Sequence, residues 1–414
     1  MEDKNFNQRG FAALFMTLII LAIMFGIAMS ISVFAVNNKK AAKNFTKSLQ
    51  AYFAAEAGVE DILLRLDNGL NWSNPYRLAV GDSSATITVS GIIGGSRAIT
   101  SEGNSQDRIR KVQVAYELST TQVQLHYGAQ IGDAGLVMQN NSIVNGNIFS
   151  DGSVNAQAGS RIEGTVKVAG VGNSITGATI SGDAHVNTCS NSGITGTLYA
   201  PVEPAPGAEC AYGSFISQSP PNPLPLPIQQ NEIDQWKAEA QNGGTIGTQS
   251  FSSGITILGP VKIVGNLAID GSAQVILKGT VWVTGNINVA NNAQVRLDSD
   301  YGSLSGIIIG DGTVTLQNNS ISSGSGTAGS YLMYISTAAL NPALIVKNLA
   351  VADVVYTSNG WIHIQNNAVL RQITGYGIEV ENNAVITYEI GLADVDFTSG
   401  PGAAWLVASW REIE

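Results

Sequence analysis

Histidine and cysteine are scarce in this chain. The three histidines, His126, His185 and His363, are isolated from one another among 414 residues, and no Cys-x-x-Cys motif occurs. Because protein metal sites are built from closely spaced Cys, His or carboxylate ligands, we expect neither a metal site nor a cofactor. The sequence also lacks a phosphate-binding loop, a nucleophile elbow and a histidine placed as the base of a serine.

Charge is scarce as well. Only 13% of the residues are charged, the formal net charge is -10, and the 21 Lys and Arg residues form no long run. Proteins that bind along nucleic acid need a basic stripe to displace counterions, so we expect no nucleic-acid partner.

Glycine is abundant, with 46 residues, while the hydrophobic share is 44%. Low charge with many turn-forming residues is typical of a mainly β protein. The length and hydrophobic content predict two or three structural units.

One long apolar run lies near the N-terminus. Residues 11–36 contain no charge, and as a helix of about 39 Å they could cross a bilayer core of about 30 Å. Lys39, Lys40 and Lys43 follow the run, but the ten residues before it sum to zero side-chain charge, so the orientation is not fixed. A cleavable secretory signal and a plain membrane anchor both fit this segment.

The helical pattern continues beyond the apolar run. Apolar residues recur at helical spacing through "NFTKSLQAYFAAEAGVEDILLRL", and no proline occurs between Phe11 and Leu66. We therefore predict one helix over residues 11–67, about 84 Å long from Phe11 to Leu66. Its first half is apolar all round and its second half is amphipathic.

At these residues the chain resembles a known family. "RGFAALFMTLIILAIMFGIAMS", followed by "YFAAEAGVEDILLRL", is similar to the N-terminus of PilX-type minor pilins of the type IV pilus superfamily. The resemblance implies a leader over residues 1–10, cleavage by a prepilin peptidase between Gly10 and Phe11, and methylation of the new N-terminus. It also implies membrane anchoring before assembly, then packing in a filament, by an apolar surface that includes Phe11, Phe15, Leu18, Ile19, Phe25 and Phe34.

The chain departs from the major pilins at the fifth mature position. Most of them carry Glu there, whereas this chain has Phe15. A carboxylate in a lipid-like core is costly unless it is paired, so a subunit without it suits a capping or priming position. The implied partners are the cytoplasmic membrane, other pilins or pseudopilins, and the prepilin peptidase.

Residues 68–120 predict a small antiparallel sheet. Segments such as "ATITVSGI" and "IRKVQVAYEL" alternate apolar and polar residues and are separated by Gly, Asp, Ser and Asn clusters. We expect this sheet to cover the apolar face of the amphipathic half-helix.

A repeated phrase then predicts a parallel β-helix. "IQNNAV" at Ile364 returns as "VENNAV" at Val380, with variants at Val137, Val289 and Leu316. Such self-similarity indicates a solenoid of about twelve coils, which we expect to be right-handed. The predicted parts are residues 121–200 and residues 250–414, the latter ending in a C-terminal cap.

The paired asparagines are predicted to form the corners of these coils. Asn tolerates the left-handed conformation that branched residues resist, and its amide can bond the equivalent amide of the next coil. Asparagines lining a sugar site are the alternative. The corner residues are Asn140, Asn141, Asn291, Asn292, Asn318, Asn319, Asn366, Asn367, Asn382 and Asn383.

Residues 201–249 are predicted to interrupt the solenoid with a Pro-rich loop and a short helix, because proline cannot occupy a central ladder. In "NEIDQWKAEAQNGG" we expect Asn231 as N-cap, supported by Asp234, with Gly243 after the last turn. We expect this helix to bury Trp236, either by packing on the side of the solenoid or by capping an open coil. This segment and the C-terminal "WLVASWREIE" also resemble PilX-like β-helical proteins.

The two cysteines, Cys189 and Cys210, are separated by 20 residues. In a chain that exports everything after Val36, this spacing favours a disulfide, whose loop closure contributes about 3 kcal/mol. Two free thiols are the alternative.

Two functions compete at this stage. Polysaccharide lyases and hydrolases on β-helices need carboxylates converging on one groove, often with Arg or Lys. Here the aspartates in the repeat region, such as Asp133, Asp183 and Asp270, mostly stand in turn-like settings. We therefore expect a non-catalytic cell-surface subunit of a type IV pilus or type II secretion-like system, which presents a rod for assembly or for adhesion to surface glycans. A membrane-anchored β-helical polysaccharide lyase or hydrolase is the alternative.

Overall fold

The computed structural model describes residues 7–67, 72–90, 96–118, 120–157, 159–205, 209–398, 400 and 405–413. The chain divides into two compact units. The first comprises Met1–Ser90, Ala98–Ala115 and Ala408–Glu414, and the second comprises Gly91–Arg97 and Tyr116–Val407. The predicted residues 1–6 of the leader lie outside the described part.

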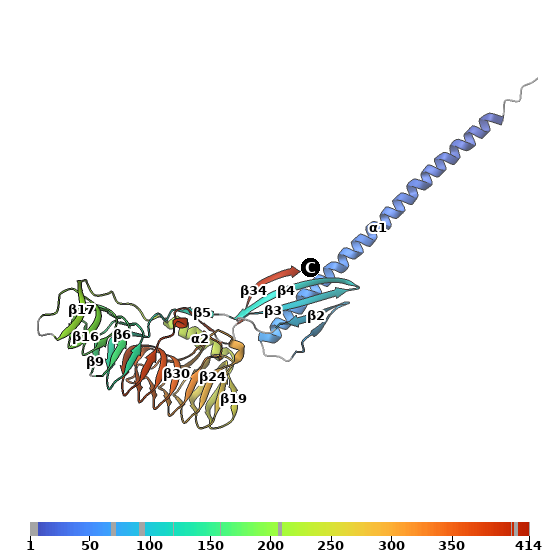
Figure 1. Cartoon of the computed structure of the whole chain (residues 1–414). Coiled ribbons are helices and arrows are strands. Elements are labelled where there is room, and N and C mark those ends of the chain that lie inside the picture. The colour runs from blue at the N-terminus through green and yellow to red at the C-terminus, as the bar shows by residue number, and fades with distance from the viewer. Residues whose placement is uncertain are drawn as a thin grey trace, which may run out of the picture. The chain divides into compact units, whose positions relative to one another are not determined.

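The first unit is built on one long helix. Helix α1 spans Asn7–Asp67, which confirms the prediction of a single uninterrupted helix (Figure 1). Residues 11–46 are exposed around its whole circumference. The apolar residues Phe11–Leu66 reach a mean hydropathy of 2.6 in their best window, so by length and composition this helix is a candidate membrane anchor.

The second half of α1 packs on a five-stranded sheet. The buried helix residues are mostly small, and they include Ala51, Ala54, Ala55 and Val59. A methyl group added to Gly103 of the sheet would collide with the carbonyl oxygen of Ala51, so the two backbones lie in close contact. The sheet order is β1-β2-β3-β4-β34, formed by Tyr76–Val80, Ser83–Val89, Ser96–Ser105, Arg108–Leu118 and Trp405–Ile413.

The C-terminal strand corrects one prediction. Residues 405–413 do not cap the solenoid, because β34 is the strand next to β4 in the small sheet. An alternating segment supplies backbone donors and acceptors that extend a sheet edge just as well as they cover a coil. The second unit is therefore an insertion between two neighbouring strands of the first.

The second unit is a parallel solenoid, as predicted. Among its described residues, 27 strands form one sheet in which successive coils pair through three parallel ladders. The strands of the first half are β6 Ala129–Met138, β7 Ile143–Asn145, β8 Ile148–Ser150, β9 Val154–Ala156, β10 Arg161–Glu163, β11 Val166–Val168, β12 Ser174–Thr176, β13 Thr179–Ile180, β14 Ala184–His185, β15 Thr188–Ser190, β16 Ser192–Ala200 and β17 Cys210–Ser217.

The second half continues the same sheet. Its strands are β18 Thr245–Phe251, β19 Ile255–Leu258, β20 Val261–Ile269, β21 Gln274–Leu277, β22 Val281–Val283, β23 Ile287–Val289, β24 Gln294–Leu297, β25 Gly306–Gly310, β26 Val314–Gln317, β27 Ile321–Ser323, β28 Leu332–Ser336, β29 Leu344–Lys347, β30 Val351–Gln365, β31 Val369–Val380 and β32 Val385–Thr387. Short 3-10 turns, η1 Ser299–Tyr301 and η2 Ile390–Leu392, complete the unit. The structure thus includes residues 210–217 and 245–249 in the solenoid, where the sequence predicted the Pro-rich loop and short helix.

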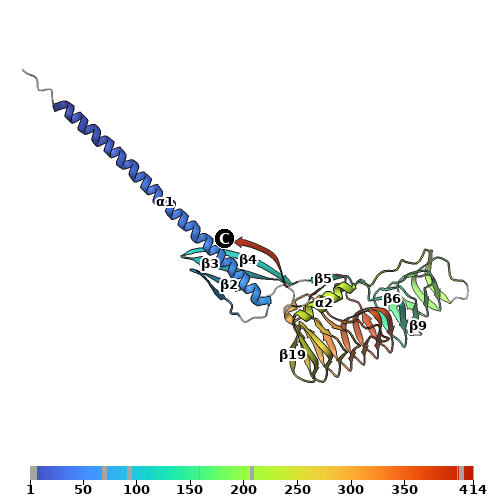
Figure 2. The ribbon, with the colours of Figure 1, turned by 180° about the vertical axis from the view of Figure 1, so that it is seen from behind.

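The order of the coils differs from the order of the chain. The last coil of the second half pairs with the first coil of the first half, through β31 with β6 and β32 with β7. In one ladder the described strands follow one another as β19-β21-β24-β27-β30-β31-β32-β7-β10-β13-β16-β17. The solenoid is therefore continuous in space, and the predicted interruption exists only along the chain (Figure 2).

The chain enters and leaves this stack at neighbouring points. Strand β5, Thr120–Val123, precedes the first coil, and β33, Val395–Thr398, follows the last one. They pair antiparallel, with Val395 opposite Val123 and Thr398 opposite Thr120. This pairing holds together the segment that leads into the solenoid and the segment that leads out of it.

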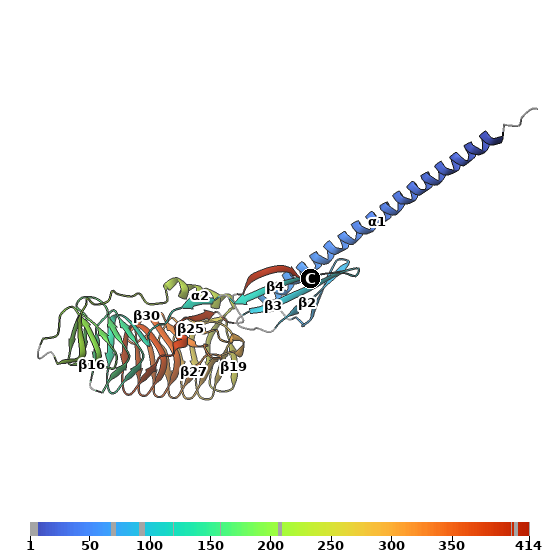
Figure 3. The same ribbon diagram turned by 45° about the horizontal axis from the view of Figure 1, so that its top comes forward.

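The Pro-rich segment bridges the two ends of the stack. After β17 the chain returns along the outside of the coils to α2, Gln230–Asn242, and then begins β18 (Figures 1 and 3). Helix α2 buries Ile233, Trp236 and Ala240, so Trp236 packs on the side of the solenoid. Its N-cap is Gln229 in a capping box with Glu232, not Asn231 with Asp234, so the helix begins two residues earlier than predicted.

A stability prediction follows from the corners. Leu349 has φ +64° at the position that Asn occupies in the neighbouring coils, and its side chain is 55% exposed. Because a left-handed conformation costs an ordinary L-residue about 1–2 kcal/mol, Leu349→Gly should raise the free energy of unfolding by about 1 kcal/mol. Thermal unfolding of the detergent-solubilised protein, followed by circular dichroism, measures the change. Asn367→Ala, at the equivalent corner with φ +61°, should lower the free energy of unfolding. A change of the same sign and size in both variants would contradict this account.

Candidate functional site

The apolar half of α1 is the largest exposed hydrophobic surface described. Its large side chains are 40–73% exposed from Phe11 to Phe34. The predicted assembly residues all lie there: Phe11, Phe15, Leu18, Ile19, Phe25 and Phe34. A surface of this size on one helix needs an apolar environment, such as lipid or other helices.

A ladder of asparagine amides runs along one corner of the solenoid. Asn140 donates from Nδ2 to Oδ1 of Asn382 at 2.8 Å, which bridges the two halves of the chain across 242 residues. The same bond repeats from Asn382 to Asn366, Asn366 to Asn348, Asn348 to Asn318 and Asn318 to Asn291, at 2.8–3.0 Å. Asn291 then donates to Asp270 at 2.7 Å.

The second asparagine of each pair contributes through its backbone. Asn367 donates its N–H to the carbonyl of Asn382, and Asn383 donates to the carbonyl of Asn140, both at 3.0 Å. Asn292 and Asn319 make the same bond with the next coil. The predicted residues thus share a corner, but only the first of each pair joins the side-chain ladder. Asn141 lies in the left-handed region with the others.

The sequence reasoning missed Asn348 and Asp270 as members of the ladder. Asn348 stands in "VKNLAV", where Leu349 replaces the second Asn, and Asp270 stands in "IDGSAQV", where Asp and Gly replace the pair. The shared signal was a small buried residue shortly after the corner, which is Ala350 two places after Asn348 and Ala273 three places after Asp270.

The Pro-rich strap, residues 220–228, is held by hydrogen bonds from several coils. Gly170 donates its N–H to the carbonyl of Pro221, and Gln130 donates from Nε2 to that of Pro225, both at 3.0 Å. The Tyr356 hydroxyl donates to the carbonyl of Ile228 at 2.8 Å. The strap therefore crosses the junction between the two halves of the solenoid.

Asp311 holds α2 against the coils. Its carboxylate accepts from Lys237 of the helix at 2.6 Å, from Trp282 Nε1 at 2.8 Å and from the Thr337 hydroxyl at 2.9 Å. Burial alone would raise the pKa of Asp311, but the hydrogen bonds from these three partners outweigh it and lower the pKa. Lys237 and Lys262 also lie over the Trp282 ring.

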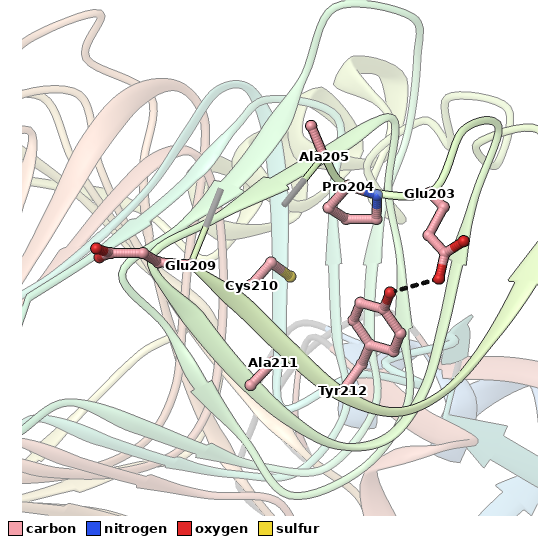
Figure 4. A pocket seen from close by; sticks show the side chains of 7 residues that line it. All are labelled: Glu203, Pro204, Ala205, Glu209, Cys210, Ala211 and Tyr212. Carbon is pink, nitrogen blue, oxygen red and sulfur yellow. Dashed lines mark hydrogen bonds between the residues drawn. The ribbon is translucent and has the colours of Figure 1, made fainter. Parts of the chain in front are cut away.

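The disulfide lies at the end of the stack formed by β16 and β17. Cys189 and Cys210 are bonded, which confirms the predicted pairing. Beside them is an open hollow of about 690 Å³ lined by Glu203, Pro204, Ala205, Glu209, Cys210, Ala211 and Tyr212. Figure 4 shows Tyr212 and Glu203 turned toward each other, joined by a 2.7 Å hydrogen bond, with Glu209 pointing away.

A second hollow, the Ser/Gly groove, lies on four adjacent coils. Its volume is about 330 Å³, and it is lined by Ser323, Gly324, Gly326, Thr327, Ala328, Gly329, Ser330, Tyr331, Asp353, Arg371 and Glu389. Arg371 bonds Asp353 through Nε at 2.8 Å and pairs with Glu389 through its terminal nitrogen. The Tyr331 hydroxyl donates to Glu389 at 3.1 Å.

Asp353 is enclosed by this arrangement. Only 5% of its side chain is exposed. One of its oxygens accepts the N–H groups of Gly324 and Leu332 at 2.8 and 3.0 Å, so a single carboxylate fixes both ends of the Ser/Gly loop. Burial raises the pKa of Asp353, and these hydrogen bonds offset the rise only in part.

The sequence reasoning missed Asp353, Arg371 and Glu389. Asp353 stands in the apolar run "VADVVY", where a carboxylate must be paired if it is buried. A carboxylate inside an apolar run was therefore the sequence signal for a buried ion pair. Its partner Arg371 lies 18 residues later, on the next coil.

Several aspartates of the repeat region bond to backbone groups close by. Asp183 accepts from the N–H of Thr197, and Asp270 accepts from the N–H of Gly271. Asp298 accepts from the N–H of Asp300, as a turn residue does. Within the part of the chain that the structure describes, no group of three or more His, Cys, Asp or Glu side chains could hold a metal ion.

Comparisons with known proteins give one structural similarity to report. No protein-family model and no curated protein sequence matches the chain. The crystal structure of the competence-associated pilin ComZ from Thermus thermophilus aligns with 12% sequence identity over 89% of this chain and 98% of that one, with a TM-score of 0.31. A similarity at this score carries no weight for the function of this chain.

The Asp311 clamp generates a pH prediction. Because the folded pKa is lowered, the clamp contributes stability above the unfolded pKa, near 3.8, and loses it as pH falls through the folded pKa. Asp311→Asn should therefore lower the free energy of unfolding by about 1–3 kcal/mol at pH 7, with the difference from wild type shrinking below about pH 4. Denaturant unfolding of the solubilised protein between pH 2 and pH 7 measures the loss of stability at pH 7 and its dependence on pH.

The matched control for this clamp is Asp300→Asn. The Asp300 side chain is 50% exposed and lies 3.8 Å from Lys278, so its loss should change stability by less than about 0.5 kcal/mol at any pH. Equal losses of stability in Asp311→Asn and Asp300→Asn would contradict the role of Asp311 in holding α2 on the coils.

Proposed function

We propose that this protein is a non-catalytic, pilin-like subunit of a type IV pilus or type II secretion-like system, which displays a β-helical rod at the cell surface. The observation that carries the proposal is the build of the first unit. One helix is apolar and exposed over residues 11–36, then continues without a break into a half whose alanine-rich face packs on a small sheet.

Such a helix suits a subunit that moves from a membrane into a filament. The apolar half of α1 would lie in the cytoplasmic membrane before assembly, and among helices of other pilins or pseudopilins afterwards, since both environments are apolar. Gly10 and Phe11 would be the processing site of a prepilin peptidase. With Phe15 at the fifth mature position, the helix carries no carboxylate there to pair with a neighbour's terminal amine, which supports a capping or priming position.

The insertion gives the subunit its display function. The solenoid begins and ends next to the paired strands β5 and β33, so it can lengthen without disturbing the strands around it. Its faces carry little charge and many amides and hydroxyls. Contacts with surface glycans along such a face would be weak singly and additive together.

The Asp353–Arg371–Glu389 cluster is the observation that favours the rival function, a membrane-anchored polysaccharide lyase or hydrolase. Hydrolysis of a glycosidic bond needs two carboxyl groups that both reach the substrate. Asp353 is enclosed and its oxygens are used by Gly324, Leu332 and Arg371. The arrangement supports binding by this groove better than cleavage in it.

The N-terminus of the mature protein tests the assembly route. Cleavage after Gly10 would leave Phe11 first, so intact mass or N-terminal sequencing of the protein from a host with prepilin peptidase should show a start at Phe11. Gly10→Leu should retain the leader. Gly26→Ala, a glycine change in the same helix with open space around it, should be cleaved normally. A start at Met1 or close to Val36 would remove the filament proposal.

A further inference from the structure

We propose that the Ser/Gly groove and the apolar row beside it form a binding site for a neutral saccharide chain. This inference rests on the proposed surface display, since it names the ligand class and the place of contact on the displayed rod.

The groove and the row belong to one face of the solenoid. Ile321, Val351 and Val369 pair in register on adjacent coils, and Val369 continues through Val385 to Ile143. The first three are 44%, 38% and 41% exposed. Two residues further along the same strands are Ser323, Asp353 and Arg371, which line the groove. Alternation along a strand points these two rows to the same side, so they form one continuous surface.

The polar part of this surface is fixed in advance. Asp353 holds both ends of the Ser/Gly loop, and the loop is further closed by the N–H of Ser325 on the Ser330 hydroxyl at 2.9 Å. The Ser330 hydroxyl in turn donates to the carbonyl of Leu304 at 2.7 Å. A loop held by this many bonds loses little conformational entropy when a ligand arrives, which favours binding.

Accessible polar groups remain after the loop is satisfied. Glu389 and Arg371 have side chains 42% and 43% exposed, and Thr327 is exposed at the tip of the loop. The Glu389 carboxylate can accept from sugar hydroxyls, the Arg371 guanidinium can donate to them, and the Thr327 hydroxyl can do both. The β-branched row, together with Ile390 at 87% exposure, offers apolar contact for the C–H face of a sugar ring. The volume of about 330 Å³ lies at the small end of ligand sites.

Charge selects a neutral ligand. Asp353 and Glu389 are negative and Arg371 is positive, so the groove carries one excess negative charge. The whole chain carries -10. An anionic polymer would meet repulsion both locally and at long range, whereas a neutral saccharide would not.

The test uses the full-length, detergent-solubilised protein. Isothermal titration with cellohexaose, maltohexaose and N-acetylchitohexaose, and with a galacturonic acid hexamer as the anionic probe, should show binding of at least one neutral oligosaccharide and weaker or no binding of the anionic one. Val369→Lys places a charge in the apolar row at an exposed position, and should weaken binding at least ten-fold. Glu389→Gln should also weaken it, while the circular dichroism spectrum and melting temperature stay close to wild type.

The matched control is Thr179→Lys. Thr179 occupies the same outward row, in register with Arg161, on a coil away from the groove. It should leave the affinity within about two-fold of wild type. Three results would overturn the proposal: no neutral hexamer binding at millimolar concentration, preferred binding of the anionic hexamer, or equal loss in Val369→Lys and Thr179→Lys. Any of these leaves cleavage at Phe11 unaffected, so the two proposals fail separately.

Discussion

The solenoid depends on the matching of backbone hydrogen bonds between coils of equal cross-section. An inner strand exchanges N–H···O=C bonds with the coils on both sides, so each corner must turn at the same place in each coil. The asparagine pairs meet this requirement, because both residues adopt φ of about +50° to +69° and the bond from the second N–H to the next coil is kept. Small buried residues, such as Ala368 and Ala384, leave room inside each corner. Loop insertions are tolerated elsewhere, because successive ladder asparagines from Asn291 to Asn382 are 16 to 30 residues apart.

Features with a local physical cause could be predicted from the sequence. The long helix follows from an unbroken apolar run, and the parallel coils follow from the recurrence of left-handed corner residues between β-branched ones. The disulfide was favoured by proximity in an exported chain. Each of these depends on residues close together in the sequence, so local conformational preference decides them.

Features that depend on which distant segments pack together could not be predicted from the sequence. Nothing local in "VMQNNSIV" shows that Asn140 stacks on Asn382, since the two lie 242 residues apart and every corner looks alike. The C-terminal segment alternates apolar and polar residues, as any edge strand does. Its sequence therefore fits pairing with β4 and covering of the last coil equally well. The groove was missed for the same reason, because Asp353, Arg371 and Glu389 come together only through stacking. The predicted right-handedness of the solenoid stays a prediction.

The path of the chain through the solenoid has a consequence for its maturation. A chain that crosses the membrane from its N-terminus delivers β6 and β7 early, yet their partners β31 and β32 come more than two hundred residues later. Until then the first half exposes an open strand edge, the kind of surface that joins foreign strands. The Cys189–Cys210 disulfide lies within that half, so once it forms it holds part of the first half together before the second half arrives. The solenoid is therefore completed when the last coil of the chain pairs with the first, which joins the two halves in the middle of one stack.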